Sequence, residues 1–491
     1  MKKRLICVII SLLLASSAAA CGNSSAQPEE TTAASAETTT ESINVEVTET
    51  TFASADVPIN DYNGAKFVIL TTGNGGQNIK HYLNSDAETE NGDNINDAIY
   101  KRNLIIEERF NVDISQYDSG NVVSDAKKSI SAGDDAYQLI IYNYTNLHSL
   151  ATGGFLTNLL DLDYLNLEAE WWDINMKNEL AISDKLYFDT GDIHLYDDMR
   201  VSCAYFNKGL WEKYGLEDPY SLVNEGKWTI EKMKHLGSNV TSDIDGNGIL
   251  DQFDLWGIVS EYAGVTDFYL GTGERFISND NGSLHIELGS EKSITVASDI
   301  LDFMRDGENI FMAENIKSDD IWKYASTIFQ EDRALIRTSC FENIPRDYRA
   351  MDTDFGVLPI PKYDESQEKH YTLARTDGYG AAIPVSVSDT DFAAIITESL
   401  ACESLNLLRP AFYEISLQGK VLRDNESEGM LDIIFANKAY DIGYLYSIGG
   451  LADSIRNQVT KKTADVSSAV AKVIPKTEKE LQKLIDTYNS L

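Results

Sequence analysis

The sequence predicts an α/β protein with two lobes. Between residues 66 and 143, strand-like and helix-like segments alternate at the lengths typical of parallel βαβ units. A strand-to-helix order returns after residue 199, and no repeat with a period of about 20–50 residues is visible, which excludes a solenoid. We therefore expect two α/β lobes that share one chain, and a chain that crosses between them more than once.

The first half supplies three strands and two helices. KFVILTT (66–72) predicts a buried strand, because it is a short apolar run that ends in the turn-rich GNGGQN. Apolar residues at helical spacing predict a helix over 94–110, and a second strand follows over 112–118. Residues 124–135 predict a helix that stops at a glycine, and residues 137–143 a third strand. Ligands bind beyond the carboxyl ends of such strands, which makes Tyr142 a candidate ligand contact.

The second half repeats this pattern with different sequences. Residues 199–216 change from strand to helix, 333–341 read as a strand, and 355–365 as a short strand interrupted by two prolines. DGYGAAIP (377–384) is typical of a crossing segment, and helices follow over 391–405 and again from residue 410. We expect residues 59–197 plus 353–405 to form lobe 1, and residues 198–352 plus 406–491 to form lobe 2.

The charge balance excludes several classes of partner. The 491 residues include 41 Lys plus Arg and 78 Asp plus Glu, which gives a net charge of −37. Nucleic-acid affinity comes from basic groups that neutralise phosphates, so we expect no nucleic-acid partner. An anionic membrane surface is disfavoured for the same reason. A strongly anionic ligand would need local compensation.

The cysteines and histidines form no local metal or disulfide motif. No two of the five cysteines make a CxxC pair, and the six histidines lack HxH or HExxH spacing. We therefore expect neither zinc, nor haem, nor a disulfide framework. The cysteines of the body, Cys203, Cys340 and Cys402, are expected to be small buried apolar residues.

The N-terminus predicts export and a lipid anchor. Lys2, Lys3 and Arg4 precede an apolar stretch over 5–14 that is too short to span a bilayer, so residues 1–20 are typical of a cleaved signal peptide. Cys21 after small residues resembles a bacterial lipobox, in which the thiol is acylated; Ala18 stands where that motif most often has Leu. Ordinary signal-peptidase cleavage beside an accidental cysteine is the alternative.

A tether follows the cleavage site. Residues 21–58 are rich in Thr, Ser, Ala and Glu and cannot bury enough apolar area to fold, so we expect disorder. As a flexible coil of about 36 residues the tether has an r.m.s. span of roughly 30–36 Å. The predicted location is the extracellular face of the cell membrane, with contact through the lipid anchor alone.

DIDGNGILDQFD (243–254) is the sharpest local motif. Its oxygens fall at positions 1, 3, 5, 7, 9 and 12 of a calcium loop, and Gly246 and Gly248 permit the tight turn. The predicted ligands of a structural calcium ion are Asp243, Asp245, Asn247, the carbonyl of Ile249, Asp251 and Asp254. The usual Glu at position 12 is replaced by the shorter Asp254. A plain Asx/Gly turn without metal is the alternative.

Three segments resemble the extracellular solute-binding proteins, family 1, that feed ABC importers, particularly the Clostridia-type lipoproteins. AYFNKGLWEKYGLEDPYSLVNEGKWTIEKM (204–233) is similar to the family's strand-to-helix segment with its following G-x-WT, and FGVLPIPKYDESQEKHYT (355–372) to its GVLP-x-PKYDE-x-Q. RPAFYEISLQGKVLRDNESEGMLDIIFANKAYDIG (409–443) is similar to helices near its C-terminus. The resemblance, which covers the chain from about residue 60, implies a two-lobe, type II periplasmic-binding-protein-like fold with a hinge and an interlobe cleft. It also implies a non-enzymatic protein that delivers a solute to an ABC permease.

A carbohydrate is the expected ligand. Sugars present apolar C–H faces beside hydroxyl edges, which suit aromatic rings paired with amides and carboxylates, and this chain has 25 Tyr and 6 Trp. The best candidate cluster is Trp171, Trp172 and Asp173, with one ring expected to face the cleft; both rings being structural is the alternative. The remaining candidates are Tyr142, Trp256, Tyr262, Tyr269, Phe341, Arg375 and Tyr379. An interlobe ion pair is the alternative role for Arg375.

Other functions stay open on the sequence. No GxSxG elbow, P-loop, GxGxxG after a strand or metal-hydrolase histidine spacing is present. A surface glycosidase would need just two suitably spaced carboxylates, which so acidic a chain offers by chance. A peptide or other small solute in place of the sugar, and a ligand sensor in place of an importer component, would use the same fold.

Overall fold

A computed structural model describes residues 52–72, 80–316, 318–417, 425–461 and 463–491, all within the unit Phe52–Leu491. The predicted signal peptide, Cys21 and most of the predicted tether lie outside the described residues. In the described ranges, no helix combines the length and the hydropathy that a bilayer crossing needs.

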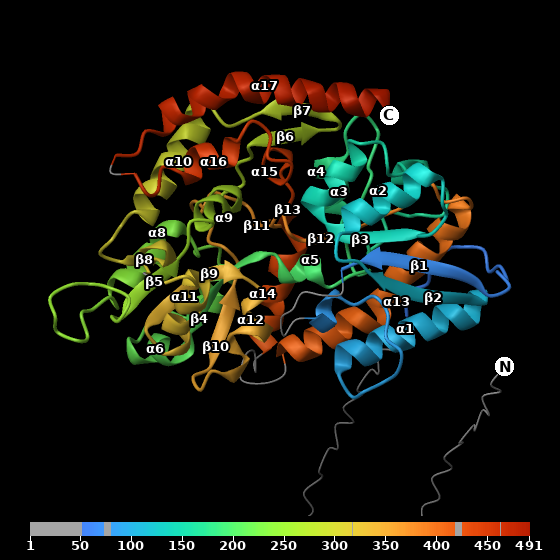
Figure 1. The fold of residues 1–491 in the computed structure, drawn as a ribbon. Coiled ribbons are helices and arrows are strands. Elements are labelled where there is room, and N and C mark those ends of the chain that lie inside the picture. The colour runs from blue at the N-terminus through green and yellow to red at the C-terminus, as the bar shows by residue number, and fades with distance from the viewer. Residues whose placement is uncertain (1–51, 73–79, 317, 418–424, 462) are drawn as a thin grey trace, which may run out of the picture. The chain divides into compact units, whose positions relative to one another are not determined.

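The first lobe is built on a four-stranded sheet in the order β12-β3-β1-β2 (Figure 1). Its strands are β1 (Ala65–Thr71), β2 (Val112–Asp118), β3 (Leu139–Asn143) and β12 (Tyr379–Ala382). β1 runs parallel to β2 and to β3, whereas β12 is antiparallel to β3. The predicted α/β fold with parallel βαβ units over residues 66–143 is confirmed.

Local signals set the ends of the first-lobe helices. α1 (Asn94–Phe110) begins after Asp93, whose side chain accepts a hydrogen bond from the Asn96 amide. α2 (Val122–Ala132) stops at Gly133, which takes the left-handed conformation with φ 71°. The other helices of this lobe are η1 (Lys80–Leu83), α3 (Tyr144–Ala151), η2 (Leu159–Asp161) and α4 (Ile174–Leu180).

The second lobe is built on a five-stranded sheet in the order β10-β4-β9-β5-β8. Its strands are β4 (Ser202–Asn207), β5 (Trp256–Ser260), β8 (Ile310–Met312), β9 (Ala334–Cys340) and β10 (Phe355–Leu358). β5 runs parallel to β8 and β9, and β4 lies antiparallel between β9 and β10. Every residue of β4, β5 and β9 is buried, as expected for central strands covered on both faces.

Helices and two short strand pairs complete this half and the connections. The strand pairs are an antiparallel hairpin of β6 (Ile277–Asp280) and β7 (Ser283–Ile286), and β11 (Thr372–Leu373) beside β13 (Lys438–Ala439). The helices are α5 (Tyr196–Met199), α6 (Lys208–Lys213), α7 (Pro219–Asn224), α8 (Ile230–Ser238), α9 (Gly264–Gly271), α10 (Glu291–Met304), η3 (Ala313–Asn315), α11 (Ile321–Gln330), α12 (Asn343–Arg346), η4 (Tyr348–Ala350), α13 (Thr390–Leu417), α14 (Asn425–Ala436), α15 (Ile442–Leu445), α16 (Leu451–Arg456) and α17 (Val466–Ser490).

α13 corrects one prediction. Two helices were expected, over 391–405 and from residue 410, but the structure has one continuous helix with Pro410 inside it. An interior proline costs about 3 kcal/mol, because it removes a hydrogen bond and crowds the preceding turn. The long contact of α13 with α1 offsets that cost. Tertiary packing therefore outweighs the local breaking signal.

The strand pairing bears on where the lobes meet. β10 hydrogen-bonds to β4 of the second sheet, although residues 353–405 were assigned to lobe 1. The chain leaves this sheet after Pro359 and Pro361, not before β10. The lobe boundaries as a whole stay a prediction.

The cysteines of the body follow the sequence analysis. Cys203, Cys340 and Cys402 are free thiols and all three are buried. Cys203 and Cys402 pack among apolar side chains, whereas the Cys340 sulfur accepts a hydrogen bond from Arg200 and donates one to Asn343. Burial raises the pKa of the Cys402 thiol to about 11, so it stays protonated.

Candidate functional site

The cleft end of the first sheet carries three tyrosines. β3 ends at Asn143, and Tyr379, the first residue of β12, pairs with it across the antiparallel ladder. The ring of Tyr379 lies 5.7 Å from that of Tyr142 and 4.9 Å from that of Tyr196, at steep angles in both pairs. Tyr142 and Tyr196 are half-buried, so their rings offer apolar surface at this strand end.

The corresponding end of the second sheet is rich in charge. β5 and β9, which run parallel, end at Ser260 and Cys340 and continue into Glu261 and Glu342. Tyr262 follows directly, and its hydroxyl donates to Asn457 over 2.7 Å. The Arg456 guanidinium lies 5.5 Å from the centre of the Tyr262 ring.

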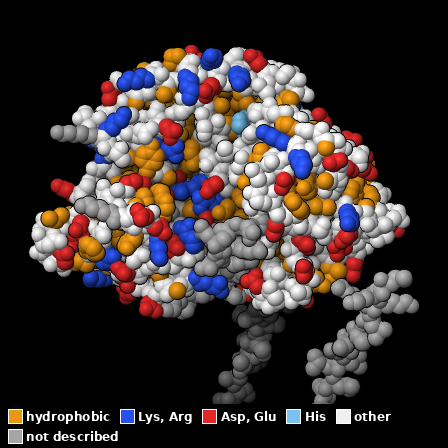
Figure 2. Space-filling view, viewed as in Figure 1, with side chains coloured by type: hydrophobic (Ala, Val, Ile, Leu, Met, Phe, Trp, Pro, Cys, Tyr) orange, Lys and Arg blue, Asp and Glu red, His pale blue; other side chains and the backbone are white. Residues whose placement is uncertain are grey.

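Connecting segments bring these two ends together. Residues 190–201 lead from Asp189, which bridges Ala381 of β12, to β4, and residues 359–378 lead from β10 to β12. Figure 2 shows basic and acidic side chains gathered in the hollow between the two halves. We call the space between the two strand ends the interlobe cleft; it is bordered by the half-buried Tyr142 and Tyr196 on one side and Tyr262 on the other, with Arg200 and Asp377 on the connections and Tyr379 and Glu342 buried behind them.

Arg200 ties the connecting segments to the second lobe. Its Nε and Nη2 donate to the two carboxylate oxygens of Asp377 over 3.0 and 2.6 Å, and its Nη1 bonds to Glu342. Asp377 remains exposed, so part of this ion pair faces solvent and can bond to a ligand. Paired, partly exposed guanidinium and carboxylate groups offer charge-assisted hydrogen bonds to hydroxyls.

Arg375 lies beneath the cleft in a buried ion cluster. Its guanidinium lies 3.1 Å from Glu261 and 2.8 Å from Asp267, and Arg337 lies 2.8 Å from Glu261. Burial alone raises the pKa of a carboxyl, but Arg337 and Arg375 together lower the pKa of Glu261 below its ordinary value. The ion pair that the sequence analysis left open for Arg375 is therefore formed, and its ligand contact stays a prediction.

The tryptophan pair lies in a different place. The indole N–H groups of Trp171 and Trp172 donate to the two oxygens of Glu398 on α13, over 3.1 and 2.8 Å. Asp173 caps α4 and lies 3.2 Å from the ammonium of Lys438. A cavity of about 410 Å³ adjoins them, bounded by α13 and α14. It is lined by Glu168, Ala169, Glu170, Trp171, Trp172, Asp173, Ile174, Asn175, Gly191, Asp192, Asp198, Arg409, Tyr413, Asp432, Phe435, Ala436 and Lys438.

The ligand contact expected of Trp171, Trp172 and Asp173 stays a prediction. Both tryptophans are over nine-tenths buried and their polar edges are occupied, so they offer little surface to a guest. Lys438 and Arg409 are already paired with carboxylates of the lining. The strand ends of the interlobe cleft are where this class of sheet places ligands.

Three further candidates are distant from the cleft walls or fully buried. Trp256 begins β5, at the opposite end of that strand from Ser260, and its N–H donates to the Asp251 carbonyl. Tyr269 is fully buried against Phe276. Phe341 follows β9 but packs into the core beside Phe412 and Phe435.

The sequence analysis missed Tyr196, Arg200, Glu342 and Asp377. Their place in the chain could have indicated them, because each lies next to the cleft end of a strand or on a connecting segment. Aromatic clustering drew attention to the Trp pair instead. Strand direction, which the sequence does not show, decides which ends meet.

The predicted calcium loop brings three carboxylates together. Oxygens of Asp243, Asp245 and Asp254 lie within 4.8 Å of one another. Gly246 and Gly248 take φ of 74° and 80°, the left-handed region that the predicted turn requires. The same carboxylates also accept backbone N–H groups: Asp243 from both glycines, and the buried Asp254 from Ile244 and Asp251.

The other predicted ligands of the loop contribute differently. The Asn247 side chain donates to Asp245 and accepts from the Ile249 amide, and Asp251 accepts from the Phe253 amide. The carboxylate set suits a hard cation, since calcium takes six to eight oxygen ligands. The three converging carboxylates therefore suit the ion, while the contribution of Asn247, Ile249 and Asp251 and the presence of calcium stay predictions.

Comparisons with known proteins identify the fold. No family model matches the chain, and no curated protein sequence matches it. Among solved structures, a cyclo/maltodextrin-binding protein complexed with maltotetraose superposes with a TM-score of 0.58 at 12% identity, covering 85% of this chain and 98% of that one. The maltose/maltodextrin-binding domain MalE from Bdellovibrio bacteriovorus bound to maltotriose gives 0.50 at 16% identity, covering 85% of this chain and 100% of that one. The predicted two-lobe fold of periplasmic binding proteins is thus confirmed.

His194 stacks on the Tyr379 ring, and its two hydrogen bonds fix the tautomer of its own imidazole. Its Nδ1 accepts from the Tyr196 amide over 3.1 Å, and its Nε2 lies 3.3 Å from the Leu83 carbonyl, to which it must donate. The imidazole stacks on the Tyr379 ring at 5.5 Å. Burial lowers the pKa of His194 to about 4, because protonation would place an unpaired charge in the interior and a hydrogen where the Tyr196 amide points.

We predict that His194 makes the fold sensitive to acid. Its folded pKa lies below the unfolded value of about 6.5, so the unfolded state binds the proton more readily and stability falls between about pH 6.5 and pH 4. From pH 7 to pH 5, the unfolding free energy of wild type should therefore fall by about 2 kcal/mol more than that of His194→Gln, measured by urea denaturation. The exposed control His235→Gln should match wild type. Equal losses in all three proteins would contradict the assignment.

Proposed function

We propose that this protein is an exported binding protein that captures an oligosaccharide in the interlobe cleft and delivers it to an ABC import permease. One observation carries the proposal: the rings of Tyr142, Tyr196 and Tyr379 pack together beside Glu342 and the Arg200–Asp377 ion pair, in a fold shared with a maltotetraose complex. The rings suit the apolar faces of a sugar, and the charged groups suit its hydroxyls. Two walls on separate lobes allow closure around the guest.

Binding without catalysis fits the charges of the cleft. A glycosidase needs a carboxylic acid held protonated near neutral pH beside a second carboxylate. Here Glu261 has a lowered pKa between two arginines, Glu342 is paired with Arg200 and Arg346, and Asp377 is paired with Arg200. These groups are suited to hold a ligand and release it unchanged.

A ligand screen tests the proposal. Calorimetry with mono- and oligosaccharides, polyols and peptides should show binding of an oligosaccharide, and Tyr142→Ala should raise its Kd about five- to tenfold by removing one ring contact. The matched control Tyr324→Ala removes an exposed tyrosine on α11 and should leave Kd unchanged. Binding of peptides alone would reject the sugar, and steady hydrolysis of the glycan would favour the enzyme.

We also propose that the loop 243–254 holds a structural calcium ion through Asp243, Asp245 and Asp254. Support comes from the convergence of these carboxylates and from the two left-handed glycines. The ion would bring the charges of an otherwise self-repelling turn into balance and so stabilise one end of the second lobe.

Calorimetric titration with calcium checks this site. We expect one ion per chain with Kd of about 10⁻⁴–10⁻³ M or tighter, and a melting temperature that falls on chelation. Asp245→Ala should abolish both effects, whereas Asp134→Ala, which removes an exposed carboxylate of the first lobe, should abolish neither. If wild-type protein gives no heat and no thermal shift with calcium, the calcium proposal is wrong and the loop is a plain Asx/Gly turn.

The anchor is proposed from the sequence. Acylation of Cys21 after removal of residues 1–20 would hold the protein on the outer face of the membrane, within reach of a permease. Mass spectrometry of the mature N-terminus should show a lipid-modified Cys21, and Cys21→Ser should release the protein into the medium. An unmodified cysteine, or cleavage elsewhere, would contradict the anchor.

A further inference from the structure

The C-terminal helix reaches across both lobes. α17 has 25 residues, about 37 Å of helix, and packs on α10 and α16 of the second lobe. Figure 1 shows it running from above α10 to the region above the first-lobe helices, where the chain ends. The helix is continuous, with Pro475 inside it. With one end on each lobe, it keeps both attachments while the lobes stay in this arrangement.

The far end of α17 is anchored on the first lobe. Tyr488 is 1% exposed, and its ring lies 5.2 Å from that of Tyr187 in a T-shaped pair. The Lys185 ammonium donates to the Tyr488 carbonyl over 2.6 Å. Both partners belong to the segment that ends at Asp189, which is bridged to Ala381 of the first sheet. The contact therefore joins α17 to the first lobe itself.

The β6–β7 hairpin makes a second such contact. The Asn279 amide donates to the carbonyls of Ala181 and Glu179, over 2.6 and 3.1 Å. Arg275, just before the hairpin, lies 2.8 Å from the Glu179 carboxylate. Glu179 lies in the last turn of α4 and Ala181 follows that helix, so the hairpin of the second half is hydrogen-bonded to the first.

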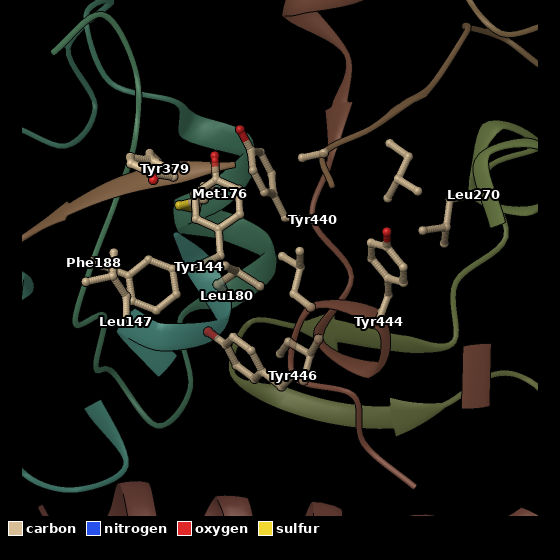
Figure 3. Packing of buried hydrophobic residues seen from close by; sticks show 14 of the residues in the cluster. Tyr144, Leu147, Met176, Leu180, Phe188, Leu270, Tyr379, Tyr440, Tyr444 and Tyr446 are labelled. Atoms are coloured by element: carbon tan, nitrogen blue, oxygen red, sulfur yellow. The ribbon is translucent and has the colours of Figure 1, made fainter. Parts of the chain in front are cut away.

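Stacked rings form a third contact. His148 on α3 lies flat against Tyr446, directly after α15, with ring centres 3.6 Å apart and planes 12° apart. Figure 3 shows Tyr446 beside Tyr144, Leu147 and Phe188 of the first lobe, with Tyr444 and Leu270 farther along the same layer. Burial keeps this imidazole neutral, since it lowers the pKa of His148 to about 4.

We propose that these three contacts form an interlobe latch. Its pairs are Asn279 with Ala181, Tyr446 with His148, and Tyr488 with Tyr187. None of the six residues belongs to the cleft walls or to the strands that connect the lobes. Rotation about the connections would part the latch, so its free energy counts in the closed state alone. The latch thus sets how much of the ligand-free protein is closed, and, on the proposed function, the affinity for saccharide.

Two variants test the latch with and without ligand. Tyr488→Ala removes the ring contact, and Asn279→Ala removes the two amide bonds to the first lobe together with the bond that its Oδ1 accepts from the Gly282 amide within the hairpin. Small-angle scattering of the ligand-free proteins should show a larger radius of gyration for both variants than for wild type. Titration with maltotetraose should show Kd raised about three- to tenfold, although neither residue lines the cleft.

The controls separate the latch from folding and from the proposed function. Asn489→Ala alters the exposed neighbour of Tyr488 on α17 and should match wild type in both measurements. If Tyr488→Ala fails to fold, Asn279→Ala decides alone. Wild-type scattering from the folded variants would overturn the latch. Absence of maltotetraose binding by wild type would count against the saccharide, while the ligand-free scattering still decides the latch.

Discussion

Buried ion pairs fix the segments that connect the two lobes, and the cleft depends on them. Lys438, next to β11, bonds to Asp197 and Asp198 over 2.7 Å each and lies near Asp173. On the other connection, Arg375 is shared by Glu261 and Asp267. A buried charge without its partner costs several kcal/mol, so each connection tolerates few other positions. The pairing thereby defines where the two strand ends face each other.

The same constraint explains how an acidic chain builds a polar cleft. With 41 basic residues against 78 acidic ones, a cation brought inside meets several carboxylates. Arg200, Arg337 and Arg375 are each held in such pairs at or beneath the cleft. They neutralise the carboxylates locally, and this leaves a cleft of paired charges and tyrosine rings that suits a neutral, hydroxyl-rich guest better than an ion.

On the proposed function, closure has two sources of free energy: the ligand that bridges the cleft walls, and the proposed latch, whose contacts involve no ligand atom. The connections fix the direction of that movement. The affinity for the ligand can then change while the residues that contact it stay the same. A protein that is closed for a larger fraction of the time binds more tightly with the same contacts. In the proposed latch, α17 and the β6–β7 hairpin have that role.

The sequence by itself determined the local elements, the two-lobe class and the turn at Gly246 and Gly248, because caps, periodicity and glycine conformation act within a few residues. It could place Tyr142 at a strand end for the same reason, whereas it assigned Tyr379 to a crossing segment and the structure makes this residue the first of β12. The tertiary structure alone decided that Trp171 and Trp172 bond to Glu398, that Trp256 lies at the far end of its strand, that Pro410 stays inside a helix, and that Arg200 meets Asp377. Those outcomes depend on strand direction and on partners far away in the chain, and burial of charge and apolar area is settled only when the distant segments meet.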